Sequence, residues 1–567
     1  MLDPVNVNKA HGYARDVASQ KIVTCRWTRL ICQRHIEDVE KQDSDNFPFY
    51  FDSKEAEKKC RLAQLFPHTK GKWAREKKLI KLEPWQLFLI ASVFGWKQKK
   101  DGLRRYREVY AKVPRKNGKS VLASVIGNLC AWLDGEFGAE VYCGATTEKQ
   151  AWEVFRPAKL MVQKTPQLMS ALGIEVNAKN MNCSRDGSRF EPIIGNPGDG
   201  SSPSCAIIDE YHEHDVDDQY STMRTGMGAR EQALIFIITT AGDNIAGPCY
   251  DKELESRELL DNQSDEDRLF PLIYGIDDDD DWTLPEVLAK ANPNIGVSVF
   301  QDWLEAEQRN AIKNVNRQNR FKTKHLNVWV SAGNQWLNTE QWRACGDSNL
   351  EIEQFHEDDC WFCLDLASKM DICAFVQLFR REIKGRLHYY SFGRYYLPED
   401  SLGLDERNES AYTRWSGKGY LTLTDGAEID FNNLEEEILE VGEDFDVIEV
   451  PHDKWRATQL AQKLEAVGLN PIEIGQGFVL GPAMRELEAA VASGRFHHDN
   501  NPVLNWMAGN LQAKEFKGNI SPMKEKKRPD QKIDGMVALL MGISRAMLDT
   551  ESEQEAIDDF LNNPISL

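Results

Sequence analysis

The chain has 567 residues, more than one hydrophobic core usually holds, so we expect two or three domains. Its 69 Lys and Arg residues against 90 Asp and Glu residues give a net charge of −21, which on its own argues against a protein coated in positive charge for binding DNA. A hydrophobic content of 41% and a charged content of 28% exclude a chain that is disordered throughout.

The sequence carries no signal of a membrane or secreted protein. No apolar run approaches the ~20 residues of a membrane span, and the N-terminal residues lack the apolar core of a signal peptide. Twelve cysteines are scattered between Cys25 and Cys373, which is not a disulfide framework for a chain of this size. We therefore expect a soluble protein of a reducing cytoplasm, with no membrane partner.

Positive charge is concentrated in one part of the chain. Between Lys54 and Lys119 there are 20 Lys and Arg residues against six Asp and Glu residues, a local charge of +14, so the remainder carries −35. Acidic residues gather in Asp277–Asp281 and Glu551–Asp559. A second basic cluster, for which a solvated surface is the simplest interpretation, consists of Lys524, Lys526, Lys527, Arg528 and Lys532.

A phosphate-binding motif lies in the first half. An extended, β-branched stretch from Arg107 leads through a polar loop into a Gly-Lys-Ser turn and a helical pattern. In such a loop the backbone N–H groups cradle phosphate oxygens, Lys119 reaches the β- and γ-phosphates, and Ser120 coordinates Mg²⁺. Val113 stands where the strict pattern has Gly, so a chance tripeptide is the alternative. The other loop residues are Arg115, Lys116, Asn117 and Gly118.

Two later apolar strands suit an ATPase. Cys205–Glu210 ends in two carboxylates, of which Asp209 would hold Mg²⁺ through water and Glu210 would orient and deprotonate the attacking water. Leu234–Ile238 is followed by hydroxyl and small residues that would couple hydrolysis to motion, or that simply end a strand: Thr239, Thr240, Ala241 and Gly242.

Upstream of the phosphate loop, Gln86 stands beside Trp85. Its amide would read the edge of adenine, and a surface glutamine on an amphipathic helix is the alternative.

The pattern of apolar strands ending in acid restarts in the second half. Trp361–Asp365 is one, with Ile372–Phe379 as the next strand of a hairpin, and Asp446–Val450 leads into His452 and Asp453. Lys532–Met547 is an amphipathic helix with Asp534 in its first turn. Three carboxylates at one pole of an α/β sheet would hold Mg²⁺ or Mn²⁺ for phosphodiester hydrolysis, although strand-end aspartates more often cap helices or turns.

Other metal-ligand candidates are weaker. Cys360 and Cys363 have no second pair at zinc spacing. His212 and His214 adjoin Asp209, where a polar loop after a phosphate-site strand is the simpler interpretation, and His497 and His498 lack partners at ligand spacing.

In this order the motifs resemble the large terminase subunit of tailed double-stranded DNA phages, over about Leu82–Met547. The resemblance is carried by PWQ (84–86), PRKNGKS (114–120), AIIDE (206–210), ITTAG (238–242), the acidic DDDDDW segment, ANP (291–293), HLNVW (325–329), LDLASKMD (364–371), PHDKWRA (451–457) and KIDGMVAL (532–539). Such proteins are ATP-driven motors that cut and package the genome. They join an ASCE-type P-loop ATPase to an RNase H-like nuclease.

The resemblance implies roles residue by residue. It places Gln86 at adenine, Lys119 and Ser120 at phosphate and Mg²⁺, and Asp209 and Glu210 at the metal and the water, with Thr239–Gly242 as the coupling motif. It makes Asp365, Asp453 and Asp534 the metal ligands of the nuclease, although the family often has Asp-Pro-Trp where this chain has Asp453, Lys454 and Trp455. An arginine that completes the ATP site would be Arg115, Arg224, Arg230 or one from a neighbouring subunit.

The expected fold is α/β with two main domains. The ATPase, with a mostly parallel sheet, would span 61–250 and the nuclease 346–550. A helical and basic extension (1–60), a lid or linker (251–345) and an acidic tail (551–567) would complete the chain.

The expected activity is ATP-driven translocation of double-stranded DNA into a procapsid, with metal-dependent cutting of the concatemer. ATP and Mg²⁺ would be cofactors, with Mn²⁺ an option at the nuclease. The partners would be DNA, a small terminase subunit, the portal and further copies in a ring such as a pentamer. The place would be the host cytoplasm and, transiently, the portal, and not the mature virion. A cellular or prophage-derived ATPase–nuclease of repair or defence, and a scaffold with a vestigial nuclease, are the alternatives.

Overall fold

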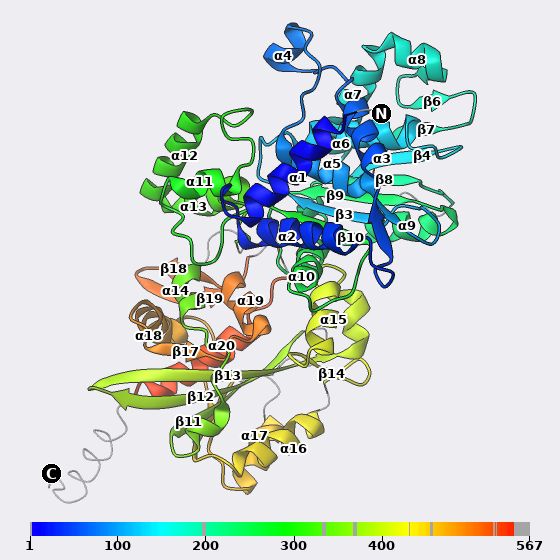
Figure 1. Ribbon diagram of the computed structural model, residues 1–567. Helices are drawn as coiled ribbons and strands as arrows, with labels where there is room; N and C mark the ends of the chain where they lie inside the picture. Colours follow the sequence, from blue (N-terminus) through cyan, green and yellow to red (C-terminus); the bar gives the residue numbers. More distant parts are fainter. Residues whose placement is uncertain are drawn as a thin grey trace, which may run out of the picture. The chain divides into compact units, whose positions relative to one another are not determined.

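The computed structural model describes residues 3–194, 200–330, 336–366, 371–429, 431–453, 458–525, 528 and 530–548 (Figure 1). The chain divides into two compact units, Met1–Val330 and Ser331–Leu567. Lys526, Lys527 and the acidic tail, which the sequence singles out, lie outside the described residues.

The first unit is built on an eight-stranded sheet in the order β10-β3-β9-β8-β4-β7-β6-β5. Neighbouring strands from β10 to β7 are parallel, whereas β6 runs antiparallel to β7 and to β5. Because β9 lies between β3 and β8, the carboxyl ends of these three strands meet at one edge of the sheet. The strands are β3 Glu108–Lys112, β4 Glu140–Ala145, β5 Ile174–Val176, β6 Met181–Cys183, β7 Arg189–Ile194, β8 Cys205–Asp209, β9 Leu234–Thr239 and β10 Leu269–Ile273.

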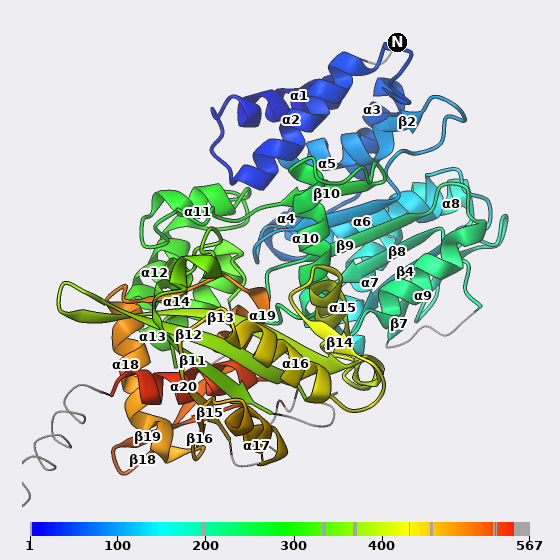
Figure 2. The same ribbon diagram turned by 90° about the horizontal axis from the view of Figure 1, so that it is seen from below.

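Helices cover both faces of this sheet (Figures 1 and 2). Side chains alternate along β3, so Val109 and Ala111 pack into one core and Tyr110 into the other. The first core is completed by α1 Val5–Ala18, α2 Arg26–Lys41, α3 Ser53–Ala63, α5 Pro84–Gly95, α6 Lys119–Trp132 and α7 Glu148–Gln163. The second is completed by α9 Asp218–Gly226 and α10 Pro248–Leu260.

Shorter elements lie at the margins of the first unit. β1 Phe49–Phe51 pairs antiparallel with β2 Trp96–Gln98, and α4 Gly71–Arg75 and α8 Pro166–Leu172 are short helices. A small helical group with a core of its own, including Leu304 and Phe321, consists of α11 Glu286–Ala291, α12 Gln301–Lys313, α13 Val315–Phe321 and a π-helical turn, η3 Lys322–Leu326.

The second unit has a mixed sheet in the order β14-β13-β12-β11-β15-β16, with β17 beside β13. β11, β12 and β13 are antiparallel neighbours, which confirms the predicted hairpin, whereas β15 runs parallel to β11 and β16 parallel to β15. The strands are β11 Asp359–Asp365, β12 Cys373–Ile383, β13 Arg386–Pro398, β14 Thr422–Thr424, β15 Val447–His452, β16 Pro471–Glu473 and β17 Phe496–His498.

One face of this second sheet packs against α16 Phe431–Gly442 and α17 Thr458–Ala466. On the other face α20 Asp534–Ala546 approaches so closely that a Cβ on Gly542 would collide with Cys363 Sγ. The remaining elements are α14 Thr339–Ala344, α15 Glu409–Gly417, α18 Gly481–Ala492, α19 Pro502–Asn510 and the hairpin β18 Gln512–Phe516 with β19 Asn519–Met523.

Both units are therefore α/β, and the predicted two-domain α/β fold is confirmed. All twelve cysteines lie in the described part of the chain, where they are buried and form no disulfide. None of the helices within the described residues is long and apolar enough to span a membrane.

Candidate active sites

The phosphate loop connects β3 to α6, as the sequence predicts. Lys116 and Gly118 adopt positive φ angles of 70° and 81°, the conformation that turns successive backbone N–H groups toward one side. At Gly118 a Cβ would lie 3.4 Å from Asn294 Nδ2 and 3.6 Å from Gln86 Nε2. These are ordinary contact distances, so the turn favours glycine for its backbone angle.

Asn117, fully buried, holds the loop in shape. Its Nδ2 donates to Pro114 O at 3.2 Å and to Asn292 Oδ1 at 2.9 Å, and its Oδ1 accepts the Asn294 N–H at 2.9 Å. Ser298 Oγ donates to Lys116 O at 2.6 Å. The loop is thus tied to the segment after α11, a support that the sequence did not reveal even though it contains the ANP motif.

Lys119 begins α6 and is buried. Its Nζ donates to Val113 O at 2.9 Å. Burial lowers the pKa of Lys119 to about 8; the carboxylates Glu210 and Asp209 oppose this shift, and the cations Arg115 and Lys324 add to it. Both strand-end acids therefore lie within electrostatic reach of the phosphate-loop lysine.

Asp209 is the last residue of β8, and Glu210 follows it with a positive φ of 49°. Burial, and next the charge of Glu210, raise the pKa of Asp209 to about 7. Glu210 Oε2 is buried and accepts no hydrogen bond from the described residues. Two carboxylates held together, one with an unused oxygen, suit a Mg²⁺ ion and an attacking water.

The end of β9 lies between the phosphate loop and these acids. Thr239 O accepts the Val113 N–H at 3.0 Å, and Thr239 Oγ1 accepts the His212 N–H at 3.0 Å. Thr240 is buried beside the His212 ring, and Gly242 O accepts the Val330 N–H at 3.4 Å. The predicted coupling residues thus contact both sides of the site.

His212 departs from the sequence interpretation of a polar loop. It is buried, and its ring lies 2.9 Å from Lys324 Nζ and 3.3 Å from Glu210 Oε2. Two of its partners, Thr239 on β9 and Lys324 on η3, are distant in sequence, so spacing along the chain could not reveal them.

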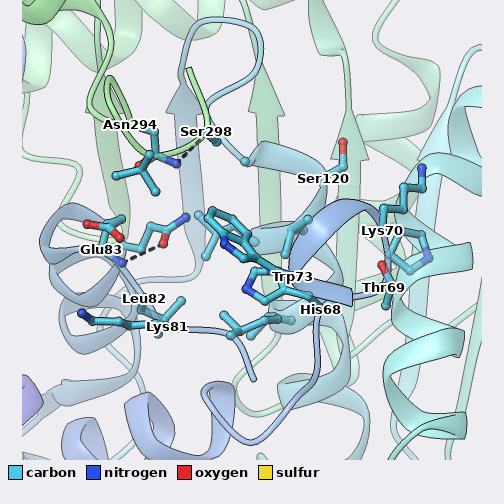
Figure 3. A pocket seen from close by; sticks show the side chains of 18 of the residues that line it. His68, Thr69, Lys70, Trp73, Lys81, Leu82, Glu83, Ser120, Asn294 and Ser298 are labelled. Carbon is cyan, nitrogen blue, oxygen red and sulfur yellow. Dashed lines mark hydrogen bonds between the residues drawn. The ribbon is translucent and has the colours of Figure 1, made fainter. Parts of the chain in front are cut away.

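A cavity of about 510 Å³ adjoins the loop (Figure 3). Its lining includes Gly118, Ser120 and Gln86, together with His68 and Trp73 from the segment around α4. Gln86 is buried, with Oε1 accepting the Glu83 N–H at 2.9 Å. Gln86 is therefore not the surface glutamine of the alternative interpretation, and it lies in the wall of the cavity beside the loop. The walls are mostly apolar and include Leu82, Val121, Leu122, Val125 and Pro157.

Two of the candidate arginines are engaged at the opposite edge of the sheet. Arg230 donates to Ser202 O and Gly138 O, just before β8 and β4 begin. Arg224 donates to Tyr220 OH, which itself donates to Glu108 at the start of β3. Of the three in-chain options, Arg115 is the one in the phosphate loop.

In the second unit the structure brings the three predicted metal-binding carboxylates to one pole of the sheet. Leu364 pairs with His452 in the parallel register of β11 and β15, so Asp365 and Asp453 follow adjacent strand ends. Asp534 opens α20, which packs across β11. Burial raises the pKa of Asp365 well above its usual value, and the charges of Asp534 and Asp453 raise it further.

Two further residues lie at this pole, Gln476 and Asp371, for which the sequence predicts no role. Gln476 Nε2 donates to Asp365 Oδ1 at 3.2 Å, and Asp371 accepts Lys532 Nζ at 2.9 Å. Burial, and next the charge of Asp371, raise the pKa of Asp534 to about 7.

The chemistry of this carboxylate group suits a hard divalent cation. Asp534 Oδ2 is buried and accepts no hydrogen bond from the described residues. Among those residues no three His, Cys, Asp or Glu side chains are already drawn together as a metal cage. A divalent ion held by these carboxylates would relieve their mutual repulsion.

Comparison with known proteins matches both units. The family described as "Terminase large subunit, ATPase domain" matches residues 84–258, and "Terminase large subunit, endonuclease domain" matches residues 263–550. ATPase and nuclease domains of this kind generally use ATP and Mg²⁺.

Two curated relatives and one solved structure are similar to this chain. The chain is 47% identical to Protein YmfN of Escherichia coli (strain K12) over 361 residues, 62% of this chain and 79% of that protein. It is 28% identical to the large terminase subunit of Enterobacteria phage HK97 over 502 residues, 86% of this chain and 95% of that one. The crystal structure of the HK97 large terminase matches with a TM-score of 0.45 and 25% identity, over 87% of this chain and 99% of that chain. The chain belongs to the terminase large subunit family, the ATPases and endonucleases that package phage DNA.

Proposed function

We propose that residues 61–250 form the ATP-hydrolysing motor, in which Lys119, Ser120, Asp209 and Glu210 act together. The observation that carries this proposal is the placement of β9 between β3 and β8, with Lys119 in the electrostatic field of both acids. Lys119 would hold the β- and γ-phosphates, with the N–H groups of Lys116, Asn117 and Gly118 and the guanidinium of Arg115 around them.

Glu210 is the proposed general base. Its buried Oε2 would accept the proton of the water that attacks the γ-phosphate. Ser120 and Asp209 would hold Mg²⁺, which neutralises charge on the phosphates when bound. Gln86 would contact the adenine. Thr239, Thr240 and Gly242 would transmit the loss of the γ-phosphate through their contacts with the loop, with His212 and with Val330, respectively.

The nuclease role falls to the second unit, over 346–550. Asp365, Asp453 and Asp534 would hold the divalent ions, Mg²⁺ or Mn²⁺, that activate water and stabilise the leaving oxygen of a phosphodiester. Gln476 would orient Asp365, and Lys532 would keep Asp371 from adding its full charge.

Several copies of the chain would work together with other proteins. We propose that copies of the chain form a ring, such as a pentamer, on the portal of a procapsid in the host cytoplasm, and that a small terminase subunit supplies site recognition. The mature virion would not retain the motor. Residues 1–60 would extend the motor and 251–345 would link its movements to the nuclease. Lys and Arg contacts to DNA phosphates would be independent of sequence and sensitive to salt.

Two substitutions test the halves separately. Glu210→Gln should abolish DNA-stimulated ATP turnover while nucleotide binding persists, and undiminished turnover would remove Glu210 from this role. Asp365→Ala should abolish Mg²⁺- or Mn²⁺-dependent plasmid cleavage while ATP turnover continues. Cleavage that persisted in both Asp365→Ala and Asp534→Ala would show that the nuclease centre is elsewhere.

A further inference from the structure

The last residues of the first unit lie across its ATPase centre. Arg115 N–H donates to Lys324 O at 2.9 Å, Ala241 N–H donates to Asn327 Oδ1 at 2.8 Å, and Val330 N–H donates to Gly242 O. The segment from η3 to Val330, which contains the HLNVW motif, is thus hydrogen-bonded to both the phosphate loop and the end of β9. A movement of the phosphate loop or of the end of β9 would therefore act on this segment.

Within this segment Lys324 points at His212. Its Nζ lies 2.9 Å from His212 Nε2. An ammonium group has no acceptor, so Nε2 must accept this hydrogen bond and the ring proton must sit on Nδ1. Burial, followed by the charges of Lys324 and Lys119, lowers the pKa of His212 to about 2, which agrees with a neutral ring.

The other ring nitrogen contacts the catalytic side of the site. Nδ1 lies 3.0 Å from Thr239 Oγ1 and 3.3 Å from Glu210 Oε2. Thr239 Oγ1 in turn donates to Thr240 O at 3.0 Å. His212 therefore connects Lys324 to the proposed general base and to the coupling threonines through one rigid ring.

Nearby carboxylates balance the charge of Lys324 only in part. It is half-buried and forms no salt bridge with any described residue. Burial and the charge of Arg115 lower the pKa of Lys324, while the carboxylate of Glu210 opposes them. Lys324 is hydrogen-bonded through its backbone to Arg115 of the phosphate loop, and the charges of both lower the pKa of Lys119, so a polyphosphate bound there would relieve the repulsion among the three cations.

We propose that Lys324 is a second phosphate-binding cation of the ATPase centre, which contacts the γ-phosphate of ATP, and that His212 positions it. ADP lacks that phosphate, so Lys324 would bind the γ-phosphate before hydrolysis and return to His212 afterwards. The exchange would move the segment that ends the first unit. This inference rests on the proposed phosphate site of Lys119.

The test compares a non-hydrolysable ATP analogue with ADP, by calorimetric titration of the full-length chain in Mg²⁺. Lys324→Ala should weaken the ATP analogue about tenfold or more, the loss of one charge-assisted hydrogen bond, and leave ADP affinity within about twofold. Lys324→Arg should restore most of the difference. Lys322→Ala is the matched control, because Lys322 lies on the same turn over the Trp282 ring at 4.7 Å, and it should change neither affinity.

The role of His212 is tested by comparing the effect of its substitution on kcat with the effect on nucleotide affinity. His212→Ala should lower kcat and the preference for the ATP analogue, whereas His212→Asn, which keeps a donor near Glu210, should recover part of kcat but not the preference. Equal weakening of both nucleotides by Lys324→Ala, or no weakening, would overturn the inference. Lys119→Ala separates it from the proposed function, because retention of both affinities in that variant would refute the phosphate site itself.

Discussion

A buried carboxylate behind the phosphate-loop strand gives a prediction with a defined magnitude. Glu253 of α10 is fully buried and accepts Lys112 Nζ of β3 at 2.6 Å and Trp329 Nε1 at 2.5 Å. Burial alone would raise the pKa of Glu253, but the charges of Lys112 and Arg257 outweigh it and hold the pKa at about 2. Against the ordinary value of 4.5, this makes the pH-dependent contribution of Glu253 to folding stability about 3 kcal/mol, although burial lowers the pKa of its partner Lys112.

Glu253→Gln should lose that contribution and leave the Lys112 ammonium buried without its carboxylate, for a total of about 3–5 kcal/mol. The folded-state pKa lies below the unfolded-state value, so the contribution is complete above pH 4.5 and is lost as the pH falls toward 2. The difference between wild type and variant should close in that window.

The assay is guanidinium unfolding of the full chain at pH 7, with and without ADP, because the transition that ADP shifts belongs to the nucleotide-binding unit. With a slope of about 6 kcal/mol per molar, the midpoint should fall by about 0.5–0.8 M. Glu255→Gln on the same helix is the control, since Glu255 is 41% exposed in its pair with Lys252 and should cost less than about 1 kcal/mol. A loss for Glu253→Gln that is no larger than the control's would refute the reasoning.

Three further predictions concern the phosphate loop, the carboxylates of the second unit and two helix glycines. Asn117→Asp cannot donate to Pro114 O or Asn292 Oδ1, so ATP and ADP affinities should both fall about tenfold or more by calorimetry, and unchanged affinities would mean that the loop keeps its shape without this amide. Because the pKa of Asp534 is about 7, plasmid cleavage at limiting Mg²⁺ should fall by up to about tenfold per pH unit below 7 and recover with added Mg²⁺, and a profile flat from pH 5 to 8 would contradict this. Gly542→Ala should destabilise the second unit by about 1–3 kcal/mol through its collision with Cys363, whereas Gly12→Ala on α1, where a Cβ meets nothing within 4 Å, should stabilise the first by about 0.5–1 kcal/mol in unfolding experiments.

The elements that carry the predicted site residues could be recognised from local pattern. β8 and β9 are continuous apolar runs because both faces of a parallel strand are buried, and α20 shows its buried stripe at helical spacing. The Gly-Lys-Ser turn and the strand-end acids are local as well. From these alone the carboxyl edge of each sheet could be identified as the place of chemistry.

The supporting contacts could not be read in the same way. Asn117 and Asn294 are 177 residues apart, and His212 and Lys324 are 112 apart. No periodicity encodes such pairs, because they arise only when the chain after α11 returns to the sheet. For the same reason the sequence indicates only a polar loop at His212. It predicts no role for Asp371, although Asp371 ends the LDLASKMD motif.

The strand order of the first unit also has a consequence for how the motor matures during synthesis. β3, which leads into the phosphate loop, is flanked by β9 and β10, whose residues begin more than 120 positions after β3 ends. When β3 leaves the ribosome, neither neighbour exists, and its ladder cannot close until about residue 273 has been made. Nucleotide binding by the nascent chain should therefore arise late and in one step, after β9 has paired between β3 and β8.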